Sequence, residues 1–143
     1  MQNNPQQERE LILVVEDDEN DAFFVQKAFE KAAVENPLRF VSTGRDAIAY
    51  LNGDPPYTDR EEYPLPSLVL LDVGLPLTDG LDVLGWIRSQ ARFAQLKVVV
   101  LTGSEEKRYA SFELGADSFM VKPLSFKDAA ELSRSIERPL VAN

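Results

Sequence analysis

Four short, largely apolar runs recur along the chain, and each of them is followed by a polar residue. They cover residues 11–15, 68–71, 98–101 and 118–121. Apolar runs of this length are typical of strands that are buried on both faces, as in a parallel sheet. Because parallel strands end at the same edge of a sheet, the residues that follow them meet there. We therefore expect carboxylates, a hydroxyl group and an ammonium group at one edge of one sheet.

Segments with a helical pattern alternate with these runs, which is typical of a doubly wound α/β fold. The expected strands are 11–16, 38–42, 68–72, 97–102 and 117–121, and the expected helices are 20–34, 44–52, 81–91, 105–114 and 125–137. In the first helix, Phe23, Phe24, Ala28 and Phe29 are expected to supply the apolar positions. We predict a single domain over residues 9–137, with a flexible tail over 1–8 and a C-terminal arm over 138–143. Residues 53–66, which are rich in Pro, Tyr and acidic residues, are expected to form a long surface loop.

Composition and charge exclude several classes of protein. The 143 residues include 15 basic and 24 acidic side chains, and the net charge of −9 disfavours a nucleic-acid partner. The absence of histidine and cysteine excludes His-based acid–base catalysis, thiolate metal sites and disulfides. No apolar stretch approaches the roughly 20 residues that span a bilayer. The sequence therefore predicts a soluble, cytoplasmic protein with no membrane partner.

Three carboxylates are the first candidates for chemistry. Glu16 and Asp17 follow the first run, and Asp72 follows the run at 68–71. Carboxylates at one edge repel each other unless a cation binds, and Mg²⁺ needs only one or two carboxylates besides waters and phosphate oxygens. The alternative is that these acids cap the first helix, and this is the interpretation we favour for Asp18. Asp72 is the candidate nucleophile, because a carboxylate can accept a phosphoryl group as an acyl phosphate.

Two further groups at the expected edge suit a phosphoryl group. Thr102 can donate a hydrogen bond to a phosphoryl oxygen, and Lys122 can pair with its charge. Lys122 precedes Pro123, and an X-Pro bond can be cis, which would aim Lys122 inward. Phosphoryl transfer depends mainly on positioning and charge stabilisation, so these groups suffice without a general base.

In this order, the strand-end motifs resemble those of a receiver domain of a two-component response regulator. The matching segments are Val15-Glu16-Asp17, Leu71-Asp72-Val73-Gly74-Leu75-Pro76 with Asp79-Gly80, Val100-Leu101-Thr102-Gly103-Ser104 and Val121-Lys122-Pro123. The resemblance covers about residues 9–137 and implies a flavodoxin-like (βα)5 sheet with strand order 2-1-3-4-5. It also implies a signalling protein, not an enzyme, that takes a phosphoryl group from a histidine kinase.

The resemblance assigns roles to the acidic cluster. Asp72 would be the phospho-acceptor. Mg²⁺ would be bound by Asp17, Asp72 and the backbone carbonyl of Gly74, with Glu16 acting through water. Gly74 departs from the commoner, longer residue at its position in the family, so any side-chain role in tuning the lifetime of the phosphate is absent.

The resemblance also implies how the phosphoryl group is read. Lys122 would contact it, and Thr102 and Phe119 would form a switch pair that reshapes the surface of the fourth helix, fifth strand and fifth helix. The loop at 53–66, the stretch 101–104 and Ser125-Phe126 followed by Ile136-Glu137 resemble the small stand-alone regulators paired with bacterial phytochrome kinases. The expected partner is therefore a phytochrome-type histidine kinase.

A homodimer is a further expectation, because no output domain follows the fifth helix. Phe126 lies on a stripe of that helix that is expected to stay exposed, and Leu140 and Val141 follow Pro139 as an apolar extension. Two such arms could bury each other's apolar residues across a two-fold axis. The alternative is a frayed terminus.

Two other functions share parts of this pattern. A phosphatase of the haloacid-dehalogenase type also uses a strand-end Asp and Mg²⁺, but its second acid, the general acid, falls at Gly74. A flavin-binding flavodoxin-like domain needs a Ser/Thr/Gly-rich phosphate loop after the first strand, where this chain has four acidic residues, 16–19. Both alternatives are disfavoured. The sequence names neither the kinase, nor its signal, nor the downstream target.

Overall fold

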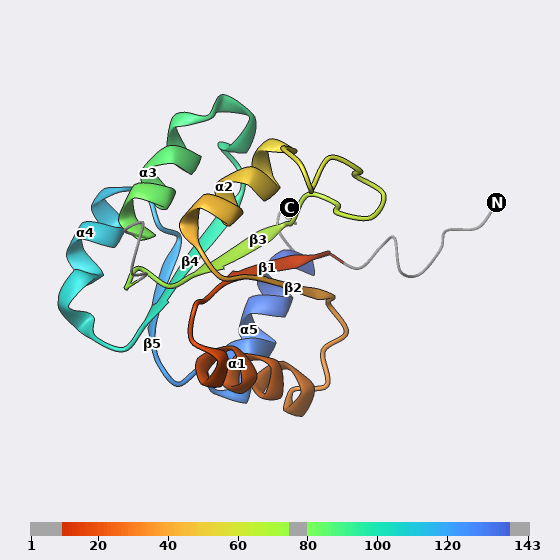
Figure 1. Cartoon of the computed structure of the whole chain (residues 1–143). Helices are drawn as coiled ribbons and strands as arrows, with labels where there is room; N and C mark the ends of the chain where they lie inside the picture. The colour runs from red at the N-terminus through yellow and green to blue at the C-terminus, as the bar shows by residue number, and fades with distance from the viewer. Residues whose placement is uncertain (1–9, 75–79, 138–143) are drawn as a thin grey trace.

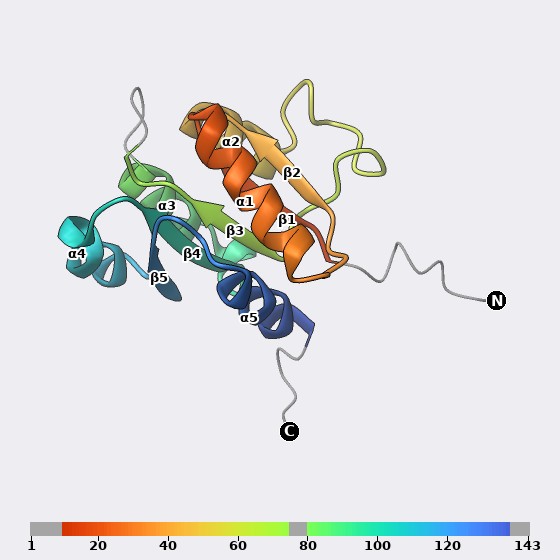
Figure 2. The ribbon, with the colours of Figure 1, turned by 90° about the horizontal axis from the view of Figure 1, so that it is seen from below.

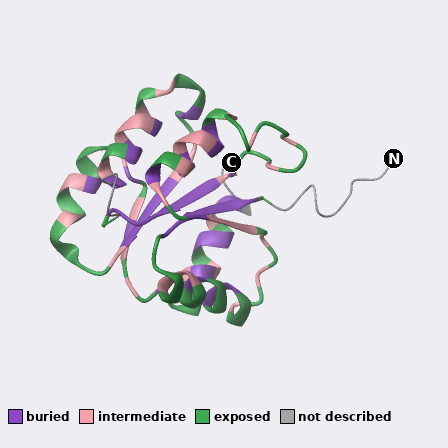
Figure 3. Cartoon of the chain, viewed as in Figure 1, coloured by how far each residue is buried: buried purple, intermediate pink, exposed green. Residues whose placement is uncertain are grey.

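Five parallel strands form the sheet of this chain, whose computed structural model describes residues 10–74 and 80–137 (Figure 1). The strands are β1 (Ile12–Val15), β2 (Leu38–Val41), β3 (Leu68–Leu71), β4 (Lys97–Thr102) and β5 (Ser118–Val121). Their order is β2-β1-β3-β4-β5, which confirms the order implied by the family resemblance. The central strands β1, β3 and β4 consist almost entirely of buried residues (Figure 3).

Helices cover both faces of the sheet. They are α1 (Glu19–Lys31), α2 (Gly44–Asn52), α3 (Gly80–Ser89), α4 (Arg108–Glu113) and α5 (Phe126–Glu137), with short 3-10 turns η2 (Ala91–Phe93) and η3 (Glu105–Lys107). α1 and α5 pack side by side on one face, and α2, α3 and α4 cover the other (Figures 1 and 2). The apolar side chains accordingly form two clusters, one on each face of the sheet. The predicted doubly wound fold is confirmed.

The helix that follows β1 is fixed by a cap that the sequence predicted. The Asp18 side chain accepts hydrogen bonds from the backbone N–H groups of Asn20 and Asp21, at 2.8 and 3.0 Å. Such a cap satisfies N–H groups that have no partner within the helix. Asp18 therefore points to the helix, which leaves Glu16 and Asp17 as the acids of this segment that face the sheet edge.

The first helix differs from its prediction in its buried face and its end. Phe23 and Phe24 are each 53% exposed, whereas Val25, Ala28 and Phe29 are buried. At roughly 100° per residue, the buried positions form one stripe, with Phe23 opposite it and Phe24 on its flank. The helix ends at Lys31, not at residue 34, because Ala33 adopts a left-handed conformation with φ of 60°.

The other boundaries differ little from those predicted, apart from the fourth helix. The expected helix over 105–114 is a 3-10 turn followed by the six-residue α4. The loop at 53–66 is held against α2, where the Tyr50 hydroxyl donates to the Pro64 carbonyl at 2.8 Å and Arg60 donates to the Leu51 carbonyl at 2.9 Å. Among the helices of residues 10–74 and 80–137, none is long and apolar enough to cross a membrane.

Candidate functional site

Strand register brings the ends of β1 and β3 together at the carboxyl edge of the sheet. Val15 pairs with Leu71, and the N–H of Asp72 donates to the Val15 carbonyl at 3.1 Å. Glu16 is fixed on the other side by its own N–H, which donates to the Val41 carbonyl of β2 at 3.0 Å. The first residues beyond the two central strands are therefore neighbours, as the sequence predicted.

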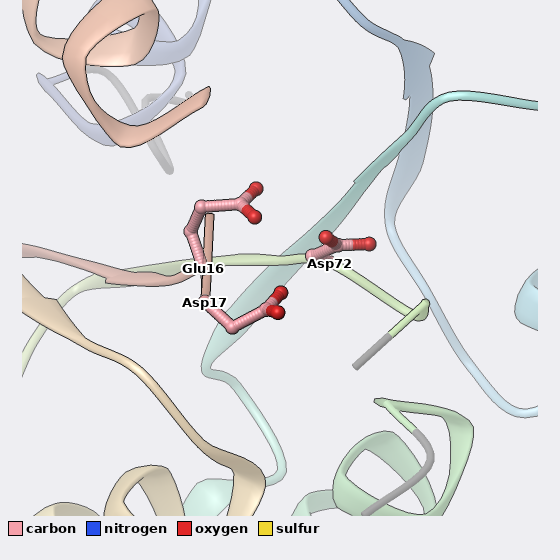
Figure 4. Close-up of side chains that lie close together, drawn as sticks. All are labelled: Glu16, Asp17 and Asp72. Atoms are coloured by element: carbon pink, nitrogen blue, oxygen red, sulfur yellow. The ribbon is translucent and has the colours of Figure 1, made fainter. Parts of the chain in front are cut away.

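The three predicted carboxylates share one small space. Figure 4 shows the carboxylates of Glu16 and Asp17 pointing toward Asp72. One oxygen from each of the three lies within 4.8 Å of the others. Glu16 and Asp72 are buried and Asp17 is exposed, so the cluster opens to solvent on the Asp17 side. Hard oxygen donors at this spacing fit a divalent cation such as Mg²⁺.

Lys122 is the basic group of the site, and it contacts three acids. Its Nζ lies 2.8 Å from Glu16 Oε1, 2.8 Å from Asp21 Oδ2 and 3.0 Å from Asp72 Oδ2. Sequence reasoning missed Asp21, which lies in the first turn of α1. Its signal was present, because the cap at Asp18 fixes the start of the helix, and the first turn therefore lies close to the acidic cluster.

Burial and charge shift the pKa values of two of these groups in a coupled way. Burial raises the pKa of Glu16 to about 7, helped by the charge of Asp72 and opposed by hydrogen bonds from Lys122 and from the N–H of Asp18. For Lys122, burial alone would lower the pKa, but its hydrogen bonds to Asp21, Glu16 and Asp72 outweigh burial and raise it. Lys122 is therefore a permanent positive charge at the site.

Asp72 is held at both carboxylate oxygens. Oδ1 accepts a hydrogen bond from the N–H of Gly74 at 2.8 Å, and Oδ2 accepts one from Lys122 at 3.0 Å. A side-chain carbon at position 74 would lie 3.4 Å from Asp72 Oδ1, which is ordinary contact distance. The hydrogen at Gly74 thus leaves this flank of the carboxylate open.

Thr102 and Phe119 lie on the same face of the sheet. Thr102 is the last residue of β4 and pairs with Val121, while Phe119 pairs with Val100. Because side chains alternate along a strand, both members of the predicted switch pair point to the side covered by α2, α3 and α4. The N–H of Lys122 donates to the Thr102 carbonyl at 2.8 Å, and the Lys122–Pro123 peptide bond is cis.

The residues predicted to form a dimer are only partly described. Phe126 is 41% exposed at the start of α5, with the Lys31 ammonium 4.9 Å from the centre of its ring. Leu140 and Val141 lie outside the described residues. The predicted arm therefore remains a prediction.

Gly80 is a site residue whose structural reason the sequence did not reveal. A Cβ at this position would lie 2.4 Å from the carbonyl oxygen of Asp72 and 2.4 Å from the Cα of Val73. The first turn of α3 thus packs directly on the backbone that carries Asp72, and only glycine fits without a shift. Gly85, one turn further along α3, has no atom near its potential Cβ.

Comparison with known proteins identifies the family. The model of the response regulator receiver domain matches residues 12–134, which is most of the chain. The chain belongs to the response regulator receiver family. It is therefore a signalling protein of the two-component type.

Several relatives of this receiver domain were found by sequence and by structure. Response regulator Rcp1 from Synechocystis sp. is 34% identical over 129 residues, which cover 89% of this chain and 86% of Rcp1. The structure of its Mn²⁺-bound form has a TM-score of 0.71 at 33% identity, covering 90% of this chain and 92% of that one. The bacteriophytochrome response regulator AtBRR has a TM-score of 0.79 at 33% identity, with coverage of 95% and 97%. The phosphorylated cyanobacterial phytochrome response regulator RcpA has a TM-score of 0.75 at 30% identity, with coverage of 91% and 92%.

The close approach at Gly80 generates the first testable prediction. Gly80→Ala should lower the free energy of unfolding by about 1–3 kcal/mol, because the added methyl group overpacks against backbone atoms that cannot move independently. It should also slow phosphorylation of the receiver domain, because the shift displaces Asp72. Urea unfolding and phosphorylation by acetyl phosphate measure the two effects.

The matched control for this prediction is Gly85→Ala in the same helix. Its methyl group meets open space, and alanine favours the helix by up to about 1 kcal/mol over glycine. We expect equal or higher stability and unchanged phosphorylation. Equal effects of the two substitutions would contradict the role of the close approach.

Proposed function

We propose that this response regulator accepts a phosphoryl group from a histidine kinase on Asp72. The observation that carries the proposal is the buried Asp72 carboxylate, bonded to Lys122 and within 4.8 Å of oxygens of two further acids. Its two hydrogen bonds, from Gly74 and Lys122, fix the orientation of the carboxylate before a donor arrives. Preorganisation of this kind is the main catalytic device for phosphoryl transfer.

The proposed step forms one bond and breaks another. A carboxylate oxygen of Asp72 attacks the phosphorus of a phosphohistidine, a P–O bond forms, and the P–N bond to the imidazole breaks. The imidazole nitrogen keeps the electron pair, and the ring leaves as neutral imidazole because its other nitrogen already carries a proton. Lys122 then donates to a phosphoryl oxygen, and Thr102 donates its hydroxyl hydrogen to another.

The charge at the site supports a divalent cation, and we propose Mg²⁺. Three carboxylates (Glu16, Asp21 and Asp72) contact the Lys122 ammonium and Asp17 lies beside two of them, which leaves three negative charges when all four are ionised. Asp17, Asp72 and the Gly74 carbonyl would hold the ion, with Glu16 acting through water. When bound, Mg²⁺ neutralises charge on the incoming phosphoryl oxygens. A solved structure of the relative Rcp1 contains Mn²⁺, a cation of similar ligand preference.

The proposed kinase partner is of the phytochrome type. AtBRR is named as a bacteriophytochrome response regulator and RcpA as a cyanobacterial phytochrome response regulator, and this chain matches nearly the whole length of both. The loop at 53–66 is one of the sequence features that led to the same expectation. Hydrogen bonds from Tyr50 and Arg60 hold it in place.

The proposed output is a switch at Thr102 and Phe119. Phosphorylation draws Thr102 toward the phosphoryl group, and Phe119 moves into the space that Thr102 leaves. Both side chains belong to the face that α4 covers, and β5 is the edge strand that leads into α5, so the proposed change alters the surface of α4, β5 and α5. The phosphoryl group shifts a population between two states through contacts that exist in only one of them.

We also propose that the chain forms a homodimer through Phe126 and the arm that contains Leu140 and Val141. Phe126 presents a large apolar ring to solvent at the start of α5. A second copy that covers this ring with an apolar arm forms an isologous interface, in which each chain supplies the same residues.

The phospho-acceptor is tested by Asp72→Asn. The amide has nearly the same shape but is a poor nucleophile, so the mass gain of one phosphoryl group after incubation with acetyl phosphate and Mg²⁺ should vanish. Intact mass spectrometry provides the measurement. Asp54→Asn, in the exposed loop at the other edge of the sheet, is the control and should be labelled like the wild type. A phosphoryl group on the Asp72→Asn protein would refute the assignment.

The metal site is tested by Asp17→Asn, which removes one of the proposed charged ligands. We expect the Kd for Mg²⁺, measured by calorimetry, to rise by roughly tenfold, about 1.4 kcal/mol. Asp18→Asn is a matched control, because it removes the same charge one residue away while asparagine still caps the helix. If both substitutions weaken binding equally, the effect is general electrostatics and Asp17 is no ligand.

The dimer is tested by removing residues 139–143 and, separately, by Phe126→Ser. Each change should lower the molar mass in light scattering at high micromolar concentration, because apolar area leaves the interface. Phe23→Ser removes a more exposed ring from the solvent side of α1 and should leave the mass unchanged. A wild-type chain that is monomeric with and without phosphorylation would exclude the dimer.

A further inference from the structure

Arg108, at the start of α4, stacks on two aromatic rings at once. Its guanidinium carbon lies 5.5 Å from the ring centre of Phe119 and 5.6 Å from that of Phe112. The two rings are themselves 6.5 Å apart with an interplanar angle of 45°. Phe119 is 7% exposed, whereas Phe112 is 43% exposed. The guanidinium group thus joins a buried ring of β5 to a surface ring of α4.

Two of the three side chains in this contact belong to α4 itself. Arg108 and Phe112 are four residues apart, so they lie on one side of the helix and face the same region of the sheet. α4 has only six residues, and a helix of that length depends on tertiary contacts more than on its own hydrogen bonds. The contacts to Phe119 are therefore part of what holds α4 on the sheet.

The position of Phe119 makes these contacts specific to one arrangement. Its ring lies against α4, while Thr102 lies one residue pair further along the same face of β4 and β5. The contacts with Arg108 and Phe112 belong to the present position of the ring, so a change of the Phe119 rotamer alters both of them. A contact that exists in only one of two states biases the equilibrium toward that state.

We propose that Arg108 is a latch that holds Phe119 on the α4 side and opposes the phosphorylation switch. This rests on the proposed function, in which Phe119 moves when Asp72 is phosphorylated. The contact with Arg108 therefore raises the free energy that the phosphoryl group must supply before Phe119 moves and the contacts of α4 change. Arginine suits this role because its planar guanidinium stacks on aromatic faces, whereas a lysine ammonium is a compact point charge.

The test compares Arg108→Ala and Arg108→Lys with the wild-type chain in the presence of Mg²⁺. Beryllofluoride, a mimic of the phosphoryl group, is titrated while NMR follows the ring signals of Phe119. We expect Arg108→Ala to bind beryllofluoride about two- to fivefold more tightly, the size of a lost cation–π contact. Arg108→Lys should lie between Arg108→Ala and wild type. Arg134→Ala removes another exposed arginine, on α5, and should match the wild type.

A second measurement needs no phosphoryl mimic. In the free Arg108→Ala protein, the Phe119 ring signals should shift toward those of the beryllofluoride-bound wild type. Phe112→Leu, which removes the second ring from under the guanidinium, should shift them in the same direction. Urea unfolding checks that the variants remain folded, as expected for an exposed side chain.

The outcomes separate the latch from the proposed function. If wild type is phosphorylated on Asp72 but Arg108→Ala has unchanged ring signals and unchanged beryllofluoride affinity, the latch is refuted and the function stands. Weaker beryllofluoride binding by Arg108→Ala refutes the latch as well, because the contact then favours the switched state. A wild type that takes up neither phosphoryl group nor beryllofluoride refutes the proposed function and the latch with it.

Discussion

The site depends on one ammonium group placed among carboxylates from three other elements. Lys122 follows β5. Its partner Glu16 follows β1, Asp72 follows β3, and Asp21 lies in the first turn of α1. Two of these acids are buried, and buried like charges at one edge would repel each other strongly without a partner. Removing one partner from a buried ion pair costs about 3–5 kcal/mol. The same contacts that make the edge ready for a phosphoryl group therefore also hold four elements together.

The charges at the site do not balance. Lys122 offsets only part of the charge of Glu16, Asp17, Asp21 and Asp72 when these acids are ionised, and the proposed cation would enter from the exposed Asp17 side. The backbone at the site is closely packed, because the first turn of α3 lies at Gly80 directly on the carbonyl group of Asp72. A fixed backbone with excess negative charge favours a cation, and a bound cation would in turn offset the negative charge of a phosphoryl group.

The sequence predicted the central strands and the edge of the sheet at which the site lies. Continuous apolar runs identified the central strands, and the residues after them identified the edge where Glu16, Asp17, Asp72 and Lys122 come together. What could not be predicted depends on tertiary context. Phe23 and Phe24 are apolar yet exposed, because the helix had room for only one buried stripe.

The remaining differences have a similar origin. Ala33 ends α1 in a left-handed conformation that favours glycine, so the sequence carried no signal for that boundary. Asp21 joins Lys122 only because of where α1 starts, which required the cap at Asp18 to be combined with the position of β5. Arg108 contacts a ring eleven positions away in sequence, on another element, and no local periodicity reports such a contact.

The alternation of side chains divides the groups near the carboxyl edge between the two faces of the sheet. Along β1 and β3, Val14 and Leu70 belong to the cluster beneath α1 and α5, and continuing the alternation places Glu16 and Asp72 on that same side. Their bonds to Lys122, and through it to Asp21 of α1, agree with this placement.

Phe119 lies on the other side, which α4 covers, in the cluster that also contains Val100. Thr102 shares the face of Val100 and ends its strand at the edge where Asp72 lies. Thr102 thus combines a place at the carboxyl edge with the face of the sheet that α4 covers. In the proposed switch, its hydroxyl group donates to a charged phosphoryl oxygen, and hydrogen bonds of this kind are roughly twice as strong as neutral ones. In the same proposal, the ring of Phe119 carries this change to the surface of α4.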